Sequence, residues 1–167
     1  MEETILIKYG ELTTKKGNRN FFIKKLKENL SYNLNNISHN IEMDQARMYL
    51  SYLSKDKEAV LKIVSNTFGI HSFHIITSCP SDLNSIESLL LKAIEKEDFK
   101  TFKIEVKRSD KSFPYRSDEL APKLGGIVLK NKKGVKVDVH QPNITIHVEI
   151  LKKKTLIYYQ SYYGIGG

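Results

Sequence analysis

The chain has 167 residues, a formal net charge of +8 and 40% hydrophobic residues, a composition typical of a folded soluble protein. This length suits one domain of common size or two small ones. The sequence contains no run of about 18 apolar residues, which excludes a membrane-spanning helix, and its first residues lack the layout of a signal peptide. We therefore expect no membrane partner and a cytoplasmic location.

Cysteine and histidine usage argues against a metal or redox site. Cys79 is the only cysteine, which excludes an intrachain disulfide and a cysteine-rich zinc site. It ends an apolar segment and has no neighbouring basic pair, so we interpret it as a buried, inert thiol. His71 and His74 flank a short apolar run and are interpreted as structural residues. No metal site is predicted.

The first 78 residues predict a ferredoxin-like domain. Asn18 caps a helix in which apolar residues recur at spacings of three and four, and Gly69 follows the end of a second helix. The apolar residues of the first helix are Phe22, Ile23, Leu26, Leu30 and Leu34. The expected elements are, in chain order, a strand over 4–8, a helix over 18–33, strands over 40–44 and 47–52, a helix over 56–68 and a strand over 70–78. This βαββαβ order is the split βαβ arrangement.

Residues 79–167 predict a second α/β domain, so the chain as a whole is assigned to the α+β class. The segment Cys79-Pro80-Ser81-Asp82 supplies the cap of a helix that ends near residue 96, and an alternating strand follows over 99–107. The next helix begins either at Ser117 or at Pro122, contains a glycine pair suited to close packing, and ends at Gly134. Three further strands are expected over 135–138, 144–151 and 155–162.

Positive charge is concentrated in the second part of the chain. Residues 1–99 contain 13 Lys/Arg and 13 Asp/Glu, whereas residues 100–167 contain 14 Lys/Arg and 6 Asp/Glu. Such asymmetry indicates a polyanionic partner. No basic amphipathic helix accompanies the charge, so nucleic acid is favoured over a membrane surface.

The basic segment 107–120 is the main candidate for nucleic-acid binding. It combines cations that neutralise phosphates with aromatic rings that offer faces to unstacked bases. The alternative is an ordinary solvated loop whose aromatics pack into the core. The candidate residues are Lys107, Arg108, Lys111, Phe113, Tyr115 and Arg116, and we favour a bracing role over stacking for Phe113 because it precedes a proline.

Two further segments extend this candidate surface. Lys15, Lys16 and Arg19 precede the first helix and are expected to continue the basic track, whereas the lysines of that helix are interpreted as a solvated face. The terminal glycines, Gly164, Gly166 and Gly167, predict either a flexible linker or a backbone-rich loop that binds phosphate or ribose. Lys152 to Lys154 are interpreted as a soluble hairpin tip.

Catalytic motifs are missing from the chain. It contains no phosphate loop, no dinucleotide-binding glycine motif, no zinc protease motif and no nucleophile elbow. The sparse carboxylates of the basic half are more simply explained as helix caps and turn residues, so no catalytic residue is predicted.

Several segments, in the right order, resemble one protein family. Residues 5–12, 15–19 and Phe22 resemble the N-terminus of bacterial tRNA 4-thiouridine synthetases, the tRNA sulfurtransferases that also serve thiamine biosynthesis. Eight later segments resemble the THUMP domain of the same family. They are Lys107 to Pro114, Ser117, Glu119-Leu120, Leu124-Gly125-Gly126, Val137-Asp138-Val139, Pro142-Asn143, Val148-Glu149-Ile150 and Gly164 to Gly167.

The resemblance implies a ferredoxin-like domain followed by a THUMP domain that holds the 3′ acceptor end of tRNA. It also implies a further ATP-pyrophosphatase domain, which would use ATP and receive sulfur from a donor protein, and whose Ser-Gly-Gly-x-Asp-Ser loop is not found in these residues. No cofactor is therefore expected here. The family further suggests a homodimer.

Two other functions remain open from the sequence. The chain is alternatively a stand-alone or differently partnered THUMP protein that serves another RNA-modifying enzyme. It is also possible to interpret the basic half as a solubility device or a protein-interaction surface, which predicts no preference for tRNA over a random RNA of equal length.

Overall fold

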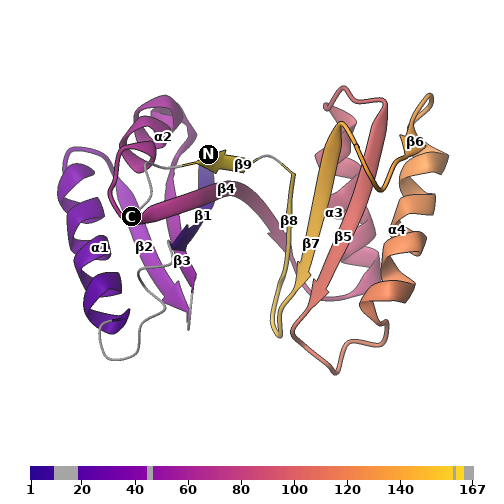
Figure 1. Ribbon diagram of the computed structural model, residues 1–167, viewed down its shortest axis with the longest axis horizontal. Coiled ribbons are helices and arrows are strands. Elements are labelled where there is room, and N and C mark those ends of the chain that lie inside the picture. The colour runs from indigo at the N-terminus through magenta and orange to yellow at the C-terminus, as the bar shows by residue number, and fades with distance from the viewer. Residues whose placement is uncertain (10–18, 45–46, 160, 164–167) are drawn as a thin grey trace. The chain divides into compact units, whose positions relative to one another are not determined.

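The computed structural model describes residues 1–9, 19–44, 47–159 and 161–163, and it divides the chain into two compact units (Figure 1). The first unit comprises Met1–Ile76 and the final segment from Ser161, and the second comprises Thr77–Gln160. No helix in the described part of the chain is long and apolar enough to cross a membrane.

The first unit has the predicted βαββαβ order. Its elements are β1 (Glu2–Tyr9), α1 (Arg19–Asn33), β2 (His39–Asp44), β3 (Arg47–Leu53), a 3-10 turn (Ser54–Asp56), α2 (Lys57–Ser65) and β4 (Ile70–Cys79). The strands form an antiparallel sheet in the order β2-β3-β1-β4, and a later strand, β9 (Ser161–Tyr163), pairs with β4.

The core of the first unit lies between this sheet and the two helices. Alternate residues of the central strands, such as Ile5, Ile7 and Leu50, are fully buried against the apolar stripe of α1. Ile23, Leu26, Leu30 and Leu34 supply that stripe, as their spacing predicted. Phe22 was predicted to belong to it, but its side chain remains 37% exposed.

Helix α2 ends three residues earlier than its apolar pattern predicted. Polar side chains at its end bond to the preceding turn: Ser65 donates to Leu61, Asn66 to Lys62 and Thr67 to Ile63. These bonds satisfy carbonyl groups that further helical turns would otherwise use. Gly69, with a φ of +98°, then redirects the chain into β4.

The second unit packs two helices against a mixed sheet. Its elements are α3 (Leu83–Glu95), β5 (Thr101–Arg108), α4 (Ser117–Asn131), β6 (Lys136–Val137), β7 (Ile144–Ile150) and β8 (Thr155–Tyr158). Strand β5 pairs in parallel with β6 and β7, and β8 pairs antiparallel with β7 and with the last three residues of β4. Asp82, in the segment predicted to supply the cap, caps α3 by accepting from the Ser85 amide at 2.8 Å.

Helices α3 and α4 lie against this sheet (Figure 1), and an apolar core of their side chains and those of the sheet joins them. Ile86 and Leu90 of α3 and Leu120 and Leu124 of α4 are fully buried. Helix α4 begins at Ser117 and continues through Pro122, so the later start is wrong. Arg116, rather than Ser117, occupies the extended N-cap position.

The glycine pair in α4 does not serve close packing. A methyl group placed on Gly125 or Gly126 would meet no atom within 4 Å, so the prediction of a tight approach is wrong. The pair instead borders an open groove of about 440 Å³ between α4, β5 and β6. Its lining includes Phe102, Ile104, Pro122, Leu129, Val137 and Val139.

The strand predicted over 155–162 is divided between the two units. Residues 155–158 form β8, which pairs with β7, whereas β9 pairs with residues 72–74 of β4. Alternation of apolar and polar residues along a strand identifies the buried face of that strand. It carries no information about which strand it pairs with, or about a change of partner along its length. The prediction of one continuous strand is therefore wrong.

We expect Asn143→Ala to destabilise the second unit by about 1 kcal/mol, a typical net value for a side-chain hydrogen bond. The Asn143 side-chain oxygen accepts from the backbone amides of Lys100 and Thr101 at 2.9 and 3.1 Å, which fixes the start of β5 beside β7. Urea unfolding measures the change. Asn143→Asp keeps an acceptor oxygen at this position, so it should lose less stability, and equal losses would contradict the assignment.

Candidate nucleic-acid interface

The candidate segment leaves the sheet at the end of β5 and enters α4. In the parallel register, Arg108 of β5 lies beside Ile150 of β7, so the chain segments that follow both strands emerge at the same end of the sheet. Two backbone bonds anchor the loop there, because the amides of Ser109 and Asp110 donate to the Ile150 carbonyl at 3.0 and 3.4 Å.

Arg108 braces this loop from within. Its guanidinium Nη1 donates to the carbonyl oxygens of Phe113 and Tyr115 at 3.1 and 3.2 Å. The side chain is half-buried and shares the face of β5 that packs against the helices. A planar guanidinium suits this task because it presents several donors in a fixed geometry. The structure therefore places Arg108 as a positioning residue of the loop.

Asp110 closes a tight turn inside the loop. Its Oδ1 accepts from the Ser112 hydroxyl at 2.6 Å and from the Ser112 amide at 3.1 Å. These hydrogen bonds hold the pKa of the Asp110 carboxyl below its ordinary value, and Lys152 and Arg108 lower it further. The carboxylate is ionised at neutral pH, so it serves as a turn acceptor, as the sequence predicted for the carboxylates of this half.

We expect Ser112→Ala to raise the pKa of Asp110 toward its ordinary value, because the hydroxyl hydrogen bond is the largest cause of its depression. A carboxyl whose pKa is lowered in the folded state favours folding above its unfolded pKa. That contribution is lost as the pH falls through the folded value. NMR titration of the carboxyl carbon measures the shift. An unchanged pKa in Ser112→Ala would contradict the turn geometry.

The two aromatic residues of the loop differ in their surroundings. Phe113 is only 5% exposed and belongs to the core of the second unit, so its ring is not available to a base. This buried position agrees with the sequence analysis, which favoured a role for Phe113 in bracing the loop over stacking on a base. Tyr115 is half-buried, its ring centroid lies 6.1 Å from that of Phe113, and Lys123 Nζ lies 5.6 Å above its ring.

The cations of the segment also differ. Arg116 Nε lies 3.1 Å from Asp118 and 3.2 Å from Glu119, two acidic residues in the first turn of α4. These exposed acidic residues compete with any phosphate for the positive charge of Arg116. Lys107 and Lys111 are exposed, and the structure gives neither an ion pair among the residues it describes. They are the cations best placed to meet a polyanion.

The β7–β8 turn contributes a cation that the sequence interpretation missed. Lys152 and Lys153 are exposed in that turn, and Lys152 lies close enough to Asp110 to lower its pKa. The parallel pairing of β5 and β7 brings the turn to the same end of the sheet, and this pairing was the missing signal. We call the surface formed by Lys107, Lys111, Arg116 and Lys152 the basic end.

Several predicted residues cannot be placed. Lys15, Lys16, Gly164, Gly166 and Gly167 lie outside the described residues, and Arg19 is described only through its backbone at the start of α1. Among the described residues, no group of three or more His, Cys, Asp or Glu is arranged to hold a metal ion. Burial raises the pKa of the Cys79 thiol, and Asp82 raises it further, which keeps the thiol protonated at neutral pH.

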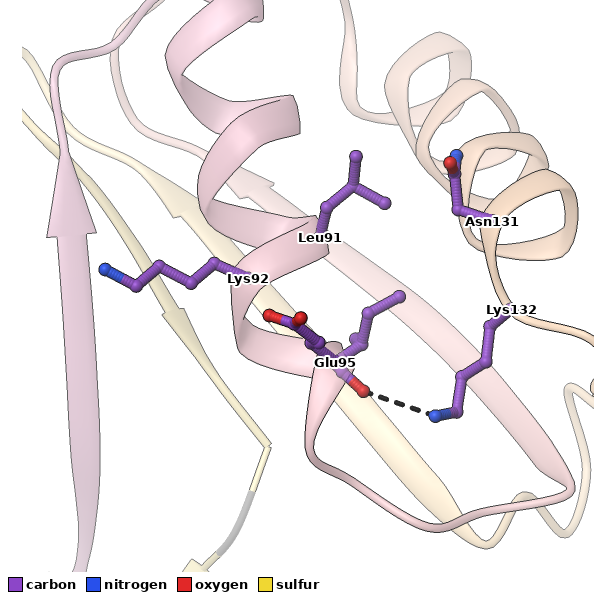
Figure 2. A pocket seen from close by; sticks show the side chains of 6 residues that line it. Leu91, Lys92, Glu95, Asn131 and Lys132 are labelled. Atoms are coloured by element: carbon purple, nitrogen blue, oxygen red, sulfur yellow. Dashed lines mark hydrogen bonds between the residues drawn. The ribbon is translucent and has the colours of Figure 1, made fainter.

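A hollow of about 450 Å³ lies at the opposite end of α4 (Figure 2). Leu91 and Glu95 of α3 and Asn131 and Lys132 at the end of α4 line it. Lys132 Nζ donates to the Ile94 carbonyl at 3.4 Å and lies 5.1 Å above the Phe99 ring. Its charge thus stabilises the C-terminus of α3, which gives this hollow a structural explanation.

Comparison with known proteins identifies both units. Residues 4–74 match the model of the ThiI ferredoxin-like domain, and residues 80–160 match that of the THUMP domain. The chain is 39% identical to a probable tRNA sulfurtransferase of Geobacillus sp. and 37% identical to one of Geobacillus kaustophilus. Each alignment covers 99% of this chain but only 42% of the relative.

Solved structures share the fold. A Pyrococcus horikoshii protein superposes with a TM-score of 0.82 at 26% identity, over 99% of this chain and 56% of that one. A 4-thiouridine synthetase, solved with RNA and ATP, gives a TM-score of 0.83 at 23% identity, over 100% of this chain and 43% of that one. The chain therefore consists of a ThiI ferredoxin-like domain followed by a THUMP domain and is homologous to the tRNA sulfurtransferases.

Proposed function

We propose that this chain is a tRNA-binding module that grips the acceptor 3′ end of tRNA for a 4-thiouridine synthetase. The observation that carries the proposal is the basic end, where exposed lysines surround a loop whose shape is fixed by internal hydrogen bonds. Lys107 lies at the end of β5, Lys111 lies in the loop, and Lys152 lies in the neighbouring turn. Cations gathered in this way neutralise phosphates without reading the base sequence.

The brace under the loop favours binding by a preformed surface. Because Arg108 and Asp110 hold the backbone through bonds within the chain, the lysines start from a fixed framework. Less conformational freedom is then lost when RNA binds. Tyr115 is half-buried, so its ring suits contact with an unpaired base better than the buried ring of Phe113 does.

The homologues support RNA as the partner. The curated relatives are named as tRNA sulfurtransferases, and a protein of the same fold was solved as a complex with RNA. Because the chain spans 42% of those relatives, we assign sulfur transfer, with its ATP and sulfur donor protein, to the part of the relatives outside this alignment. A homodimer and a cytoplasmic location stay predictions.

The predicted residues whose side chains the structure does not describe belong to the same proposal. Lys15, Lys16 and Arg19 would extend the phosphate contacts, and the backbone of Gly164, Gly166 and Gly167 would approach the terminal nucleotide. Both assignments rest on the sequence and on the family resemblance alone.

The test compares a tRNA with a random RNA of equal length at the same ionic strength, by fluorescence anisotropy of the labelled RNA. We expect the tRNA to bind more tightly, because the random chain lacks an acceptor end in the required geometry. Equal affinity would contradict the proposal, since it is the result expected of a basic surface that serves only solubility or non-specific attraction.

A further inference from the structure

Helix α1 presents aromatic side chains on the face turned away from its own core. Phe21 is 65% exposed and Tyr32 is 77% exposed, whereas Ile23, Leu26 and Leu30 are buried on the other side. Exposed hydrophobic residues that stand singly are normal on a protein surface, so the exposure of each ring alone does not identify a site. What distinguishes these two rings is their alignment on one helix face together with lysines.

The two exposed aromatic residues lie on one line along the helix. Residues 21 and 32 are separated by just over three helical turns, so their side chains leave α1 in nearly the same direction, about 16 Å apart. Lys25 and Glu28 lie between them on this face, and Lys24 lies beside it, all exposed. The rings of Phe21 and Phe22 also meet edge to face at 6.0 Å, which supports the position of Phe21.

Lysines outnumber acidic residues on the exposed side of α1. Lys24, Lys25 and Lys27 are exposed there, and Glu28 is the one acidic residue of the helix. Lysine is depleted at the core of protein–protein interfaces because its ammonium group is costly to desolvate. Exposed aromatic rings and lysines on one face are, in contrast, the combination that binds single-stranded nucleic acid.

We propose that the outward face of α1, formed by Phe21, Lys24, Lys25 and Tyr32, is a second RNA-binding surface. Unpaired bases stack on the two aromatic rings, and the two lysines bind the intervening phosphates. This inference rests on the proposed function, because it assumes that the chain binds tRNA. It adds a stacking contact in the ferredoxin-like domain to the phosphate contacts of the basic end.

The chain contains no tryptophan, which allows a direct test. Phe21→Trp and Tyr32→Trp each introduce a single fluorophore at a proposed stacking position, and a stacked nucleobase quenches indole emission. The matched control is Phe68→Trp, since Phe68 is 63% exposed in the same unit and has no Lys or Arg within five residues of sequence. Each variant of the 167-residue chain is titrated with tRNA while anisotropy of the labelled RNA reports binding.

We expect tRNA to quench Phe21→Trp and Tyr32→Trp with the same midpoint as the anisotropy change and to leave Phe68→Trp unaffected. Phe21→Ala/Tyr32→Ala should raise the Kd for tRNA about 30-fold or more, the loss expected for two stacked bases. Unchanged emission and affinity in these variants, with tRNA binding intact, would overturn the inference. That result would assign the face to another class of partner, such as a protein, and would leave the proposed function standing.

Failure of the proposed function itself gives a different result. The unmodified chain would then show no preference for tRNA in the anisotropy assay, whatever residue occupies position 21 or 32. Such a result overturns both proposals together. A loss confined to the α1 variants supports the inference, and it is distinguished from unfolding by an unchanged circular dichroism spectrum.

Discussion

Replacing Lys107 and Lys111 together by alanine is expected to weaken tRNA binding roughly tenfold or more at low salt. Both lysines are exposed, and the structure gives neither an ion pair among the described residues, so their charge is available to phosphates. Each phosphate contact that is lost should also lower the slope of log affinity against log salt by about one. A titration series in increasing salt measures both quantities in the same samples.

The chain offers a matched control for this variant. Lys100 and Lys136 are exposed and lie at the other end of the same sheet, where β5 and β6 begin. Lys100→Ala/Lys136→Ala removes the same charge from the same unit, so a contribution from net charge alone would appear equally in both double variants. Equal losses of affinity would contradict the assignment of the basic end, whereas a loss confined to Lys107→Ala/Lys111→Ala would confirm it.

Replacing Arg108 by lysine is expected to weaken tRNA binding almost as much as replacing it by alanine. The guanidinium donates to the Phe113 and Tyr115 carbonyls, and an ammonium on a flexible stem does not reproduce that geometry. Because these bonds come from a charged donor and lie in a half-buried site, their loss should cost about 2–3 kcal/mol of unfolding free energy. Urea unfolding and RNA titration are measured on the same variants.

A charge-conserving exchange at the neighbouring residue provides the comparison. Lys107→Arg keeps an exposed cation at the end of β5 and alters no bond within the loop, so it should retain both stability and tRNA affinity. If Arg108→Lys also retained tRNA affinity, Arg108 would act as a phosphate contact by charge alone. That outcome would contradict its role as a positioning residue.

The order of elements was predictable because local patterns determine it. Spacings of three and four identified α1 and α3, and alternation identified β5 and β7. The cap of α3 was found in the predicted segment, whereas α2 and α4 end at Ser65 and Asn131, before the glycines that were expected to end them. Each of these signals acts within a few residues of the chain, so a single sequence contains it.

Features that depend on distant partners were not predictable in this way. The pairing of β9 with β4, and the approach of Lys152 to Asp110, follow from strand register between segments far apart in the sequence. The same limit applies to Arg108, which the sequence presented as one cation among several. Its position on the helix-facing side of β5, beside two carbonyls, is visible only once the loop is folded.

The proposed grip on the acceptor end is tested most directly with a tRNA acceptor minihelix, prepared with and without its unpaired 3′ nucleotides. We predict that the intact minihelix binds more tightly, and that Lys107→Ala/Arg108→Ala removes most of this difference. If the chain bound both minihelices equally and the double variant changed neither affinity, the basic end would not be a site for the acceptor 3′ end.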